Sequence, residues 1–146
     1  MTETKRPKVE FVFNAELIRI VDGDTLELSI DRGFSDHTRM MARLYGCDTP
    51  ETRGPEAEAG KWVATQVAAW FGDRRDVVCH SVRYRRDSFG RSLFHVWLDD
   101  KCITDWLLAK GYAWRTDEAG KVIGPRSVES LGLPEGVKQA VREAFA

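Results

Sequence analysis

The sequence has few of the features that mark secreted or membrane-embedded chains. It contains only three cysteines among 146 residues, an odd number at wide spacing, which argues against a disulfide framework and a zinc site. We interpret Cys47, Cys79 and Cys102 as reduced packing residues. No run approaches the roughly 18 consecutive apolar residues that a membrane span needs, so we predict no membrane partner.

The N-terminal residues also lack an apolar segment after their basic residues, so they do not read as a secretory signal. This predicts a cytoplasmic chain, or a mature secreted form whose signal was removed. Nor is one charge in excess: 22 Lys and Arg face 23 Asp and Glu, for a net charge of −1. Arginines are nonetheless concentrated between residues 74 and 91. A basic segment of this kind is consistent with local binding of a polyanion, and equally with a solvent-exposed run of charges that binds nothing.

What the sequence does contain is enough apolar character for a core, with 42% hydrophobic residues. The length predicts one domain, here residues 10–146, preceded by a flexible arm over residues 1–9. Residues 10–21 predict a first strand, and a change of phase at Ile18 and Ile20 indicates a bulge or bend. A tight turn at 22–24 and alternation over 26–30 predict a hairpin. Further strands are expected at 37–46, 76–84 and 92–98.

Three helices are expected among these strands. The first starts at Gly54-Pro55-Glu56 and runs to residue 71 before Gly72, and the second covers 102–110 before Gly111. Residues 116–133 read as a polar loop. A last helix over 134–145 would turn Val137, Ala140, Val141 and Phe145 inward. The order of elements predicts a five-stranded OB-fold β-barrel with two to three α-helices, an α+β protein.

Four acids fall in loops at the ends of the first three predicted strands: Asp22, Asp24, Asp48 and Glu51. If these strands are neighbours, the acids meet at one end of the barrel. Clustered carboxylates repel one another unless a cation or a proton holds them. Oxygen ligands without His or Cys indicate Ca²⁺ or Mg²⁺. Taken singly, each acidic motif is more often a turn or a helix cap.

Two arginines lie near these acids or near a tight turn. Arg43 precedes Asp48 by five residues, and Arg91 follows Phe89-Gly90. Guanidinium groups offer paired donors to the charge that grows on phosphoryl oxygens when a phosphodiester is cleaved. An isolated arginine, however, is more commonly a surface residue.

In combination, these segments resemble the staphylococcal nuclease family in order and spacing. The matching segments are IVDGDT at 20–25, RLYGCDTPET at 43–52, GPEA at 54–57, DSFGR at 87–91 and LLAKGYA at 107–113. A turn such as Asp-Gly-Asp-Thr is weak evidence alone, whereas arginine, four residues and then Asp-Thr-Pro-Glu-Thr is specific. The resemblance covers about residues 16–115.

The resemblance implies a five-stranded OB barrel with three helices and a Ca²⁺-dependent nuclease. Its substrate would be DNA or RNA, single-stranded or frayed, cut at the bond to the 5′ oxygen to leave 3′-phosphates. Asp24, Asp48 and the Thr49 carbonyl would bind one Ca²⁺, and Asp22 would hold a metal-bound water. Glu51 would orient or deprotonate the attacking water. Arg43 and Arg91 would stabilise the five-coordinate phosphorus.

The chain also departs from the family pattern. The loop between Glu51 and Pro55 is short, and the tyrosines that normally follow the second helix are absent. The base preference is therefore open. Trp114 is placed to stack on a base, and packing of the last loop explains it equally well. The residues that we assign to nucleic-acid contacts are Arg39, Arg85, Arg86, Ser88, Phe89 and Trp114.

Two other readings stay open. One is a non-catalytic OB-type module that binds nucleic acid or protein; such a relative should have lost the acids or arginines, and this chain keeps them. The other is a nuclease controlled by a partner, such as an unidentified protein inhibitor. His37, His80 and His95 lack the spacing of a metal site and are interpreted as strand residues.

Overall fold

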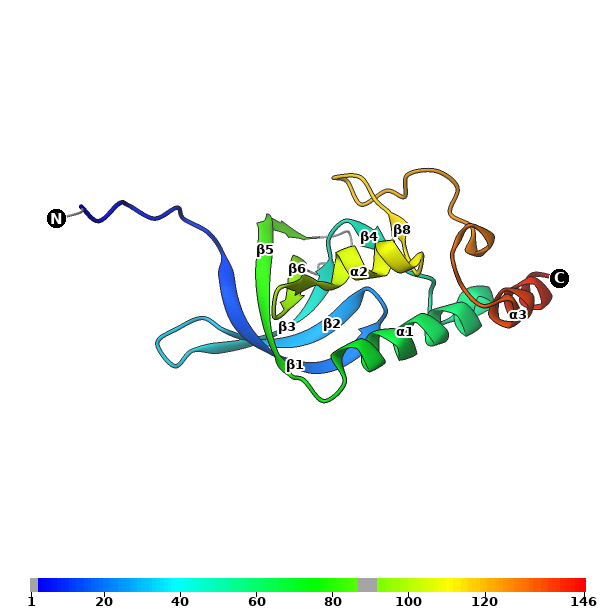
Figure 1. Ribbon diagram of the computed structural model, residues 1–146, viewed down its shortest axis with the longest axis horizontal. Helices are drawn as coiled ribbons and strands as arrows, with labels where there is room; N and C mark the ends of the chain where they lie inside the picture. The colour runs from blue at the N-terminus through cyan, green and yellow to red at the C-terminus, as the bar shows by residue number, and fades with distance from the viewer. Residues whose placement is uncertain (1–2, 87–91) are drawn as a thin grey trace.

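In the computed structural model, which describes residues 3–86 and 92–146, five strands close into a barrel (Figure 1). The sheet runs in the order β3-β2-β1-β5-β6, and β3 also pairs with β6 in parallel, which joins the two edges. The predicted five-stranded OB barrel is confirmed. The barrel strands are β1 (Val12–Asp22), β2 (Thr25–Asp31), β3 (His37–Leu44), β5 (Asp76–Arg86) and β6 (Ser92–Leu98).

β1 serves two neighbours because it bends. Residues 15–22 pair with β2, whereas residues 12–16 pair with β5. The register of β1 against β2 shifts between Leu17 and Arg19 and again between Ile20 and Asp22. These shifts confirm the bulge that the change of phase predicted, and they aim the end of β1 at the turn that carries Asp22 and Asp24.

Three α-helices complete the fold, and none of the helices that the structure describes is long and apolar enough to cross a membrane. A 3₁₀ turn, η1 (Gly54–Glu56), leads into α1, and a second, η2, precedes α3. Figure 1 shows α1 lying along the barrel, α2 on the other side of the core and α3 beside the start of α1. The elements are α1 (Ala57–Phe71), α2 (Ile103–Lys110), η2 (Val128–Ser130) and α3 (Glu135–Phe145).

Three very short strands were not predicted: β4 (Cys47–Asp48), β7 (Lys101–Cys102) and β8 (Trp114–Arg115). β4 pairs with β8 in antiparallel orientation, with Asp48 opposite Trp114. β3 ends at Leu44, two residues before the predicted end, because Gly46 turns the chain at φ 93°. The acidic loop after β3 is therefore tied to the segment that follows α2.

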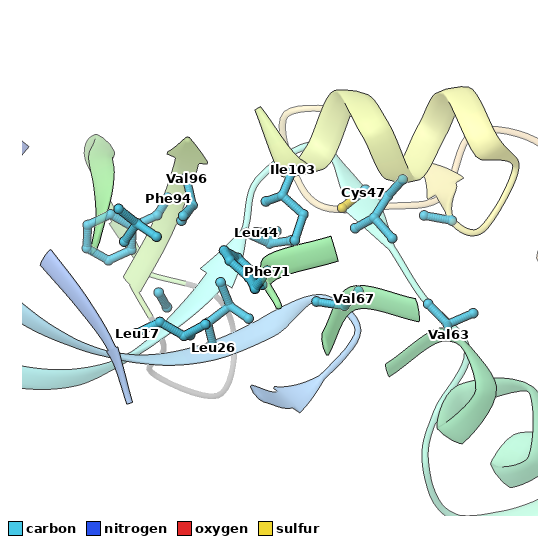
Figure 2. Packing of buried hydrophobic residues seen from close by; sticks show 14 of the residues in the cluster. Leu17, Leu26, Leu44, Cys47, Val63, Val67, Phe71, Phe94, Val96 and Ile103 are labelled. Carbon is cyan, nitrogen blue, oxygen red and sulfur yellow. The ribbon is translucent and has the colours of Figure 1, made fainter. Parts of the chain in front are cut away.

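The core lies between the barrel and the helices α1 and α2 (Figure 2). Leu26 and Leu44 from the barrel face Val67 and Phe71 of α1, and Ile103 covers them from α2. All three cysteines are free, and Cys47 and Cys79 are buried. Burial raises the pKa of both thiols to about 12. Cys47 and Cys79 are thus free packing residues, as predicted, whereas Cys102 is only partly buried.

One predicted core residue is wrong. Val141 of α3 is buried, but Phe145 is 64% exposed. The periodicity of α3 places Phe145 on the inner stripe, yet it is the last residue of the helix. Figure 1 shows α3 at one end of the molecule. A periodic pattern indicates which face of a helix turns inward, but not how far along the helix its neighbours reach.

Candidate functional site

The predicted acids line one cleft of about 720 Å³ at an end of the barrel. Its walls come from the end of β1, the first turn, β3 and the loop after β4. The floor and rim are formed by Arg19, Val21, Asp22, Asp24, Arg43, Asp48, Thr49, Pro50, Glu51, Thr52 and Arg53. Segments more than 20 residues apart in the sequence thus converge, as the hairpin pattern predicted.

Asp24 is the most buried acid of the cleft. Its Oδ2 accepts a hydrogen bond from the Thr49 backbone N–H (2.9 Å), and its Oδ1 accepts one from the Thr25 hydroxyl (3.1 Å). Arg43 forms an ion pair with the same carboxylate. These partners offset the cost of burying a charge. They also fix the loop that holds Thr49 against the first turn.

Arg43 joins the two acids that flank it. Thr25 and Arg43 are paired residues of β2 and β3, so the guanidinium starts next to Asp24. Its Nη2 also lies 3.2 Å from Asp48 Oδ1, and its side chain is only 14% exposed. Burial alone would lower the pKa of Arg43, but the two carboxylates outweigh it and the pKa is raised. Arg43 is therefore a fixed positive charge on the cleft wall.

Asp48 is half-buried and sits on β4, opposite Trp114 of β8. Burial raises the pKa of Asp48, and a hydrogen bond from Arg126 opposes that rise. The adjoining Thr49 places its backbone carbonyl near the same guanidinium, 3.5 Å from Arg126 Nη2. Asp48 and Thr49 thus present oxygen atoms beside those of Asp24.

Glu51 stands at the mouth of the cleft, with a side chain that is 67% exposed. Burial of its inner part raises the pKa of Glu51, and the charges of Asp24 and Asp48 raise it further. Asp22 lines the same cleft and is held by the Thr52 hydroxyl, which donates to its Oδ1 at 2.6 Å. The Glu51 carboxylate is therefore accessible to solvent, and the Asp22 carboxylate is held in one orientation by Thr52.

The loop that carries Glu51 rests directly on α1. A Cβ added to Gly60 would lie 2.1 Å from the Glu51 carbonyl oxygen, so only glycine allows the helix and the loop to approach this closely. Gly60 lies in a helix interior, where glycine costs about 1 kcal/mol relative to alanine. The close contact explains why that cost is tolerated here.

Sequence reasoning missed Arg126, a charged residue that contacts an acid of the cleft. Arg126 Nε donates to Asp48 Oδ2 at 2.8 Å, and Nη1 donates to Glu56 Oε2 at 2.6 Å. Its guanidinium carbon lies 4.3 Å from the centre of the Trp114 ring. Arg126 belongs to the segment predicted as a polar loop and lies beyond residues 16–115, so neither periodicity nor the resemblance pointed to it.

The remaining predicted contacts are distributed elsewhere. Arg39 is exposed and lies 3.5 Å from Glu27. Arg85 and Arg86 lie on β5. Trp114 is only 5% exposed, and its indole N–H donates to the Ser127 carbonyl at 3.1 Å. Its ring therefore packs the last loop, the alternative that the sequence left open, and has no open face for a base. Ser88, Phe89 and Arg91 lie outside the described residues.

The oxygen atoms of the cleft are of the chemical type that binds a hard cation. Asp24 and Asp48 contribute carboxylates and Thr49 contributes a backbone carbonyl, all oxygen ligands of the kind that Ca²⁺ and Mg²⁺ prefer. Arg43 contacts both carboxylates, which places them around one point. Within residues 3–86 and 92–146, no group of three or more His, Cys, Asp and Glu side chains is arranged to hold a metal ion. A cation here would therefore depend on the carbonyl, on water or on substrate oxygens.

Comparison with known proteins relates this chain to nucleases. The model of the family described as staphylococcal nuclease homologue matches residues 41–127. The thermonuclease of Staphylococcus intermedius is 34% identical over 98 residues, which cover 65% of this chain and 55% of the relative. The thermonuclease of Staphylococcus hyicus is 28% identical over 100 residues, 67% of this chain and 56% of the relative. The chain thus spans about half the length of these curated relatives.

Proposed function

We propose a nuclease activity for this chain, which belongs to the family of staphylococcal nuclease homologues. The bond cleaved is a phosphodiester of DNA or RNA bound in the cleft around Arg43. The observation that carries the proposal is the bridge that one guanidinium makes between Asp24 and Asp48. It places a fixed positive charge beside oxygen ligands for a cation, and both a guanidinium and a cation can stabilise the charge that grows during phosphodiester hydrolysis.

We propose Ca²⁺ as the cofactor, held by Asp24, Asp48 and the Thr49 carbonyl. A bound divalent cation would supply Lewis acidity toward a phosphate oxygen and lower the pKa of water. Asp24 is suited to this role because its backbone and hydroxyl donors keep its carboxylate in one orientation. Asp22, oriented by Thr52, faces the same cleft and would hold a water molecule.

Glu51 is proposed to accept the proton of the attacking water. Its carboxylate is exposed at the cleft mouth, where water and substrate meet. A carboxylate in this position is one of the groups that act as general bases. The water oxygen attacks phosphorus as its proton passes to Glu51. The bond to the 5′ oxygen then breaks, and the leaving 5′ oxygen takes a proton from solvent water, so that a 3′-phosphate and a 5′-hydroxyl are left.

Arg43 is proposed to donate hydrogen bonds to the phosphoryl oxygens as their charge grows. Because its orientation is fixed by two carboxylates, little reorganisation is needed in the transition state. Arg91, which lies outside the described residues, is proposed as the second arginine. The substrate is proposed to be single-stranded or frayed DNA or RNA.

Cleavage of end-labelled single-stranded DNA and RNA tests this function. We expect both the loss of full-length strand and products that end in a 3′-phosphate, identified by a shift in mobility after phosphatase treatment. Tight binding of the strands without cleavage would contradict the proposal and favour the non-catalytic OB module. Products that end in a 3′-hydroxyl would contradict the proposed bond.

A further inference from the structure

Arg126 contacts two acids of the cleft, Asp48 and Glu51, although the proposed mechanism gives it no role. Its Nε donates to Asp48 at 2.8 Å, and its Nη1 donates to Glu56 at 2.6 Å. Its Nη2 lies 3.5 Å from the Thr49 carbonyl oxygen and 3.8 Å from the Glu51 carboxylate. Each of the three guanidinium nitrogens thus lies near an acid or the carbonyl.

The surroundings hold Arg126 in this place. Its guanidinium lies over the Trp114 ring, which is itself fixed by hydrogen bonds to Ser127 and Ser130. Trp114 in turn pairs with Asp48 through the β4–β8 ladder. Glu56, its strongest partner, has a side chain that is 13% exposed. The bonds to Glu56 and Asp48 outweigh burial and raise the pKa of Arg126, so it keeps its charge.

Two of these contacts fall on oxygens that a cation would use. Asp48 Oδ1 faces Arg43 and Asp48 Oδ2 faces Arg126, so both oxygens of this carboxylate are bonded to arginines. The Thr49 carbonyl also lies at the edge of the Arg126 guanidinium. Like charges within a few ångströms in a partly buried site oppose one another strongly. A divalent cation entering here therefore meets a resident positive charge.

We infer that Arg126 is a positioning residue that acts as a built-in counter-cation: it neutralises Asp48, Glu51 and Glu56 and competes with the divalent cation for Asp48 and the Thr49 carbonyl. The inference rests on the cation site of the proposed function. Its consequence is a lower cation affinity than the acids alone would give. Arg126 also couples the Ca²⁺ affinity to the segment after β8, since a movement of that segment would shift the guanidinium relative to Asp48.

Calorimetric titration of Ca²⁺ into wild type, Arg126→Gln and Arg126→Lys tests this inference without any measurement of activity. Arg126→Gln is expected to bind Ca²⁺ about tenfold more tightly, a change that corresponds to roughly 1.4 kcal/mol. Arg126→Lys keeps the charge and is expected to stay closer to wild type. Arg74→Gln is the matched control: Arg74 pairs with Asp99, neither residue lines the cleft, and the loss of Arg74 should leave Ca²⁺ affinity unchanged.

Thermal unfolding of the same variants provides a second readout. In chelator, Arg126→Gln should melt below wild type, because Glu56 and Asp48 lose their partner. Saturating Ca²⁺ should restore more stability to Arg126→Gln than to wild type, since a ligand bound more tightly stabilises the native state further. A merely structural arginine would lower the melting temperature equally with and without Ca²⁺.

The outcomes separate the inference from the function beneath it. If wild type binds Ca²⁺ and Arg126→Gln binds it equally or more weakly, the inference is overturned and the cation site stands. If Arg126→Gln binds Ca²⁺ and wild type does not, Arg126 excludes the cation altogether, which supports the inferred competition. If neither protein binds Ca²⁺, the cation site fails, and the inference fails with it.

Discussion

Arg43→Ala is expected to lower kcat/KM for single-stranded DNA by roughly two to three orders of magnitude. This is the scale of removing one preorganised donor from a developing oxyanion, about 3–4 kcal/mol. Arg43 pairs with Thr25 across β2 and β3, and its guanidinium contacts both Asp24 and Asp48. Its loss removes the charge and leaves each acid without one of its partners. Steady-state cleavage assays measure the effect.

The same substitution is expected to destabilise the fold. Removing one partner of a buried ion pair typically costs about 3–5 kcal/mol, because the remaining charge stays buried without compensation. Arg43→Lys separates the two effects: it retains the charge but lacks the fork that spans two carboxylates. Arg32→Ala is the control, since Arg32 pairs with Asp36 in an exposed turn. Near-normal cleavage by folded Arg43→Ala would contradict the assignment.

Glu51→Gln is expected to lower the rate of cleavage by roughly two to four orders of magnitude, the usual contribution of a positioned general base. Glutamine keeps the size of the side chain but cannot accept the proton. Stability should change little, because Glu51 is largely exposed and its contact with Arg126 is long, at 3.8 Å. Rates at saturating Ca²⁺ and urea unfolding curves give the two measurements.

A neighbouring acid provides the control for Glu51→Gln. Glu58 is exposed in the first turn of α1, near the same loop but outside the cleft, so Glu58→Gln should cleave at the wild-type rate. If Glu51→Gln also cleaved at the wild-type rate, Glu51 would be no more than an orienting residue. If Glu51→Gln unfolded more easily than wild type, the loss of activity would have a structural cause instead.

Much of the barrel end was predictable because it depends on short-range patterns. Alternation over 26–30 and 37–44 fixes which residues share a face, and the turn over 32–36 between β2 and β3 fixes the register that pairs Thr25 with Arg43. The approach of Asp24, Arg43 and Asp48 follows from these local rules. Their roles in catalysis, the role of Arg91 and the division into arm and domain stay predictions.

What could not be predicted depends on contacts between distant segments without a repeating pattern. β4 and β8 have two residues each, too few to show alternation. The placement of Arg126 depends on that pairing and on the Trp114 ring beneath it, both of which arise only when the chain is folded. Phe145 shows a different error. Its position in the helical repeat predicted an inward side chain, but it is the last residue of α3 and its side chain is exposed.

The central claim is that carboxylates from separate strands hold one hard divalent cation in this cleft. Titration of Ca²⁺ into wild type and Asp24→Asn, with Asp100→Asn as a surface control and circular dichroism to confirm folding, tests it most directly. The account predicts one Ca²⁺ per chain in wild type and in Asp100→Asn, and none in folded Asp24→Asn. Equal Ca²⁺ binding by wild type and folded Asp24→Asn would contradict it.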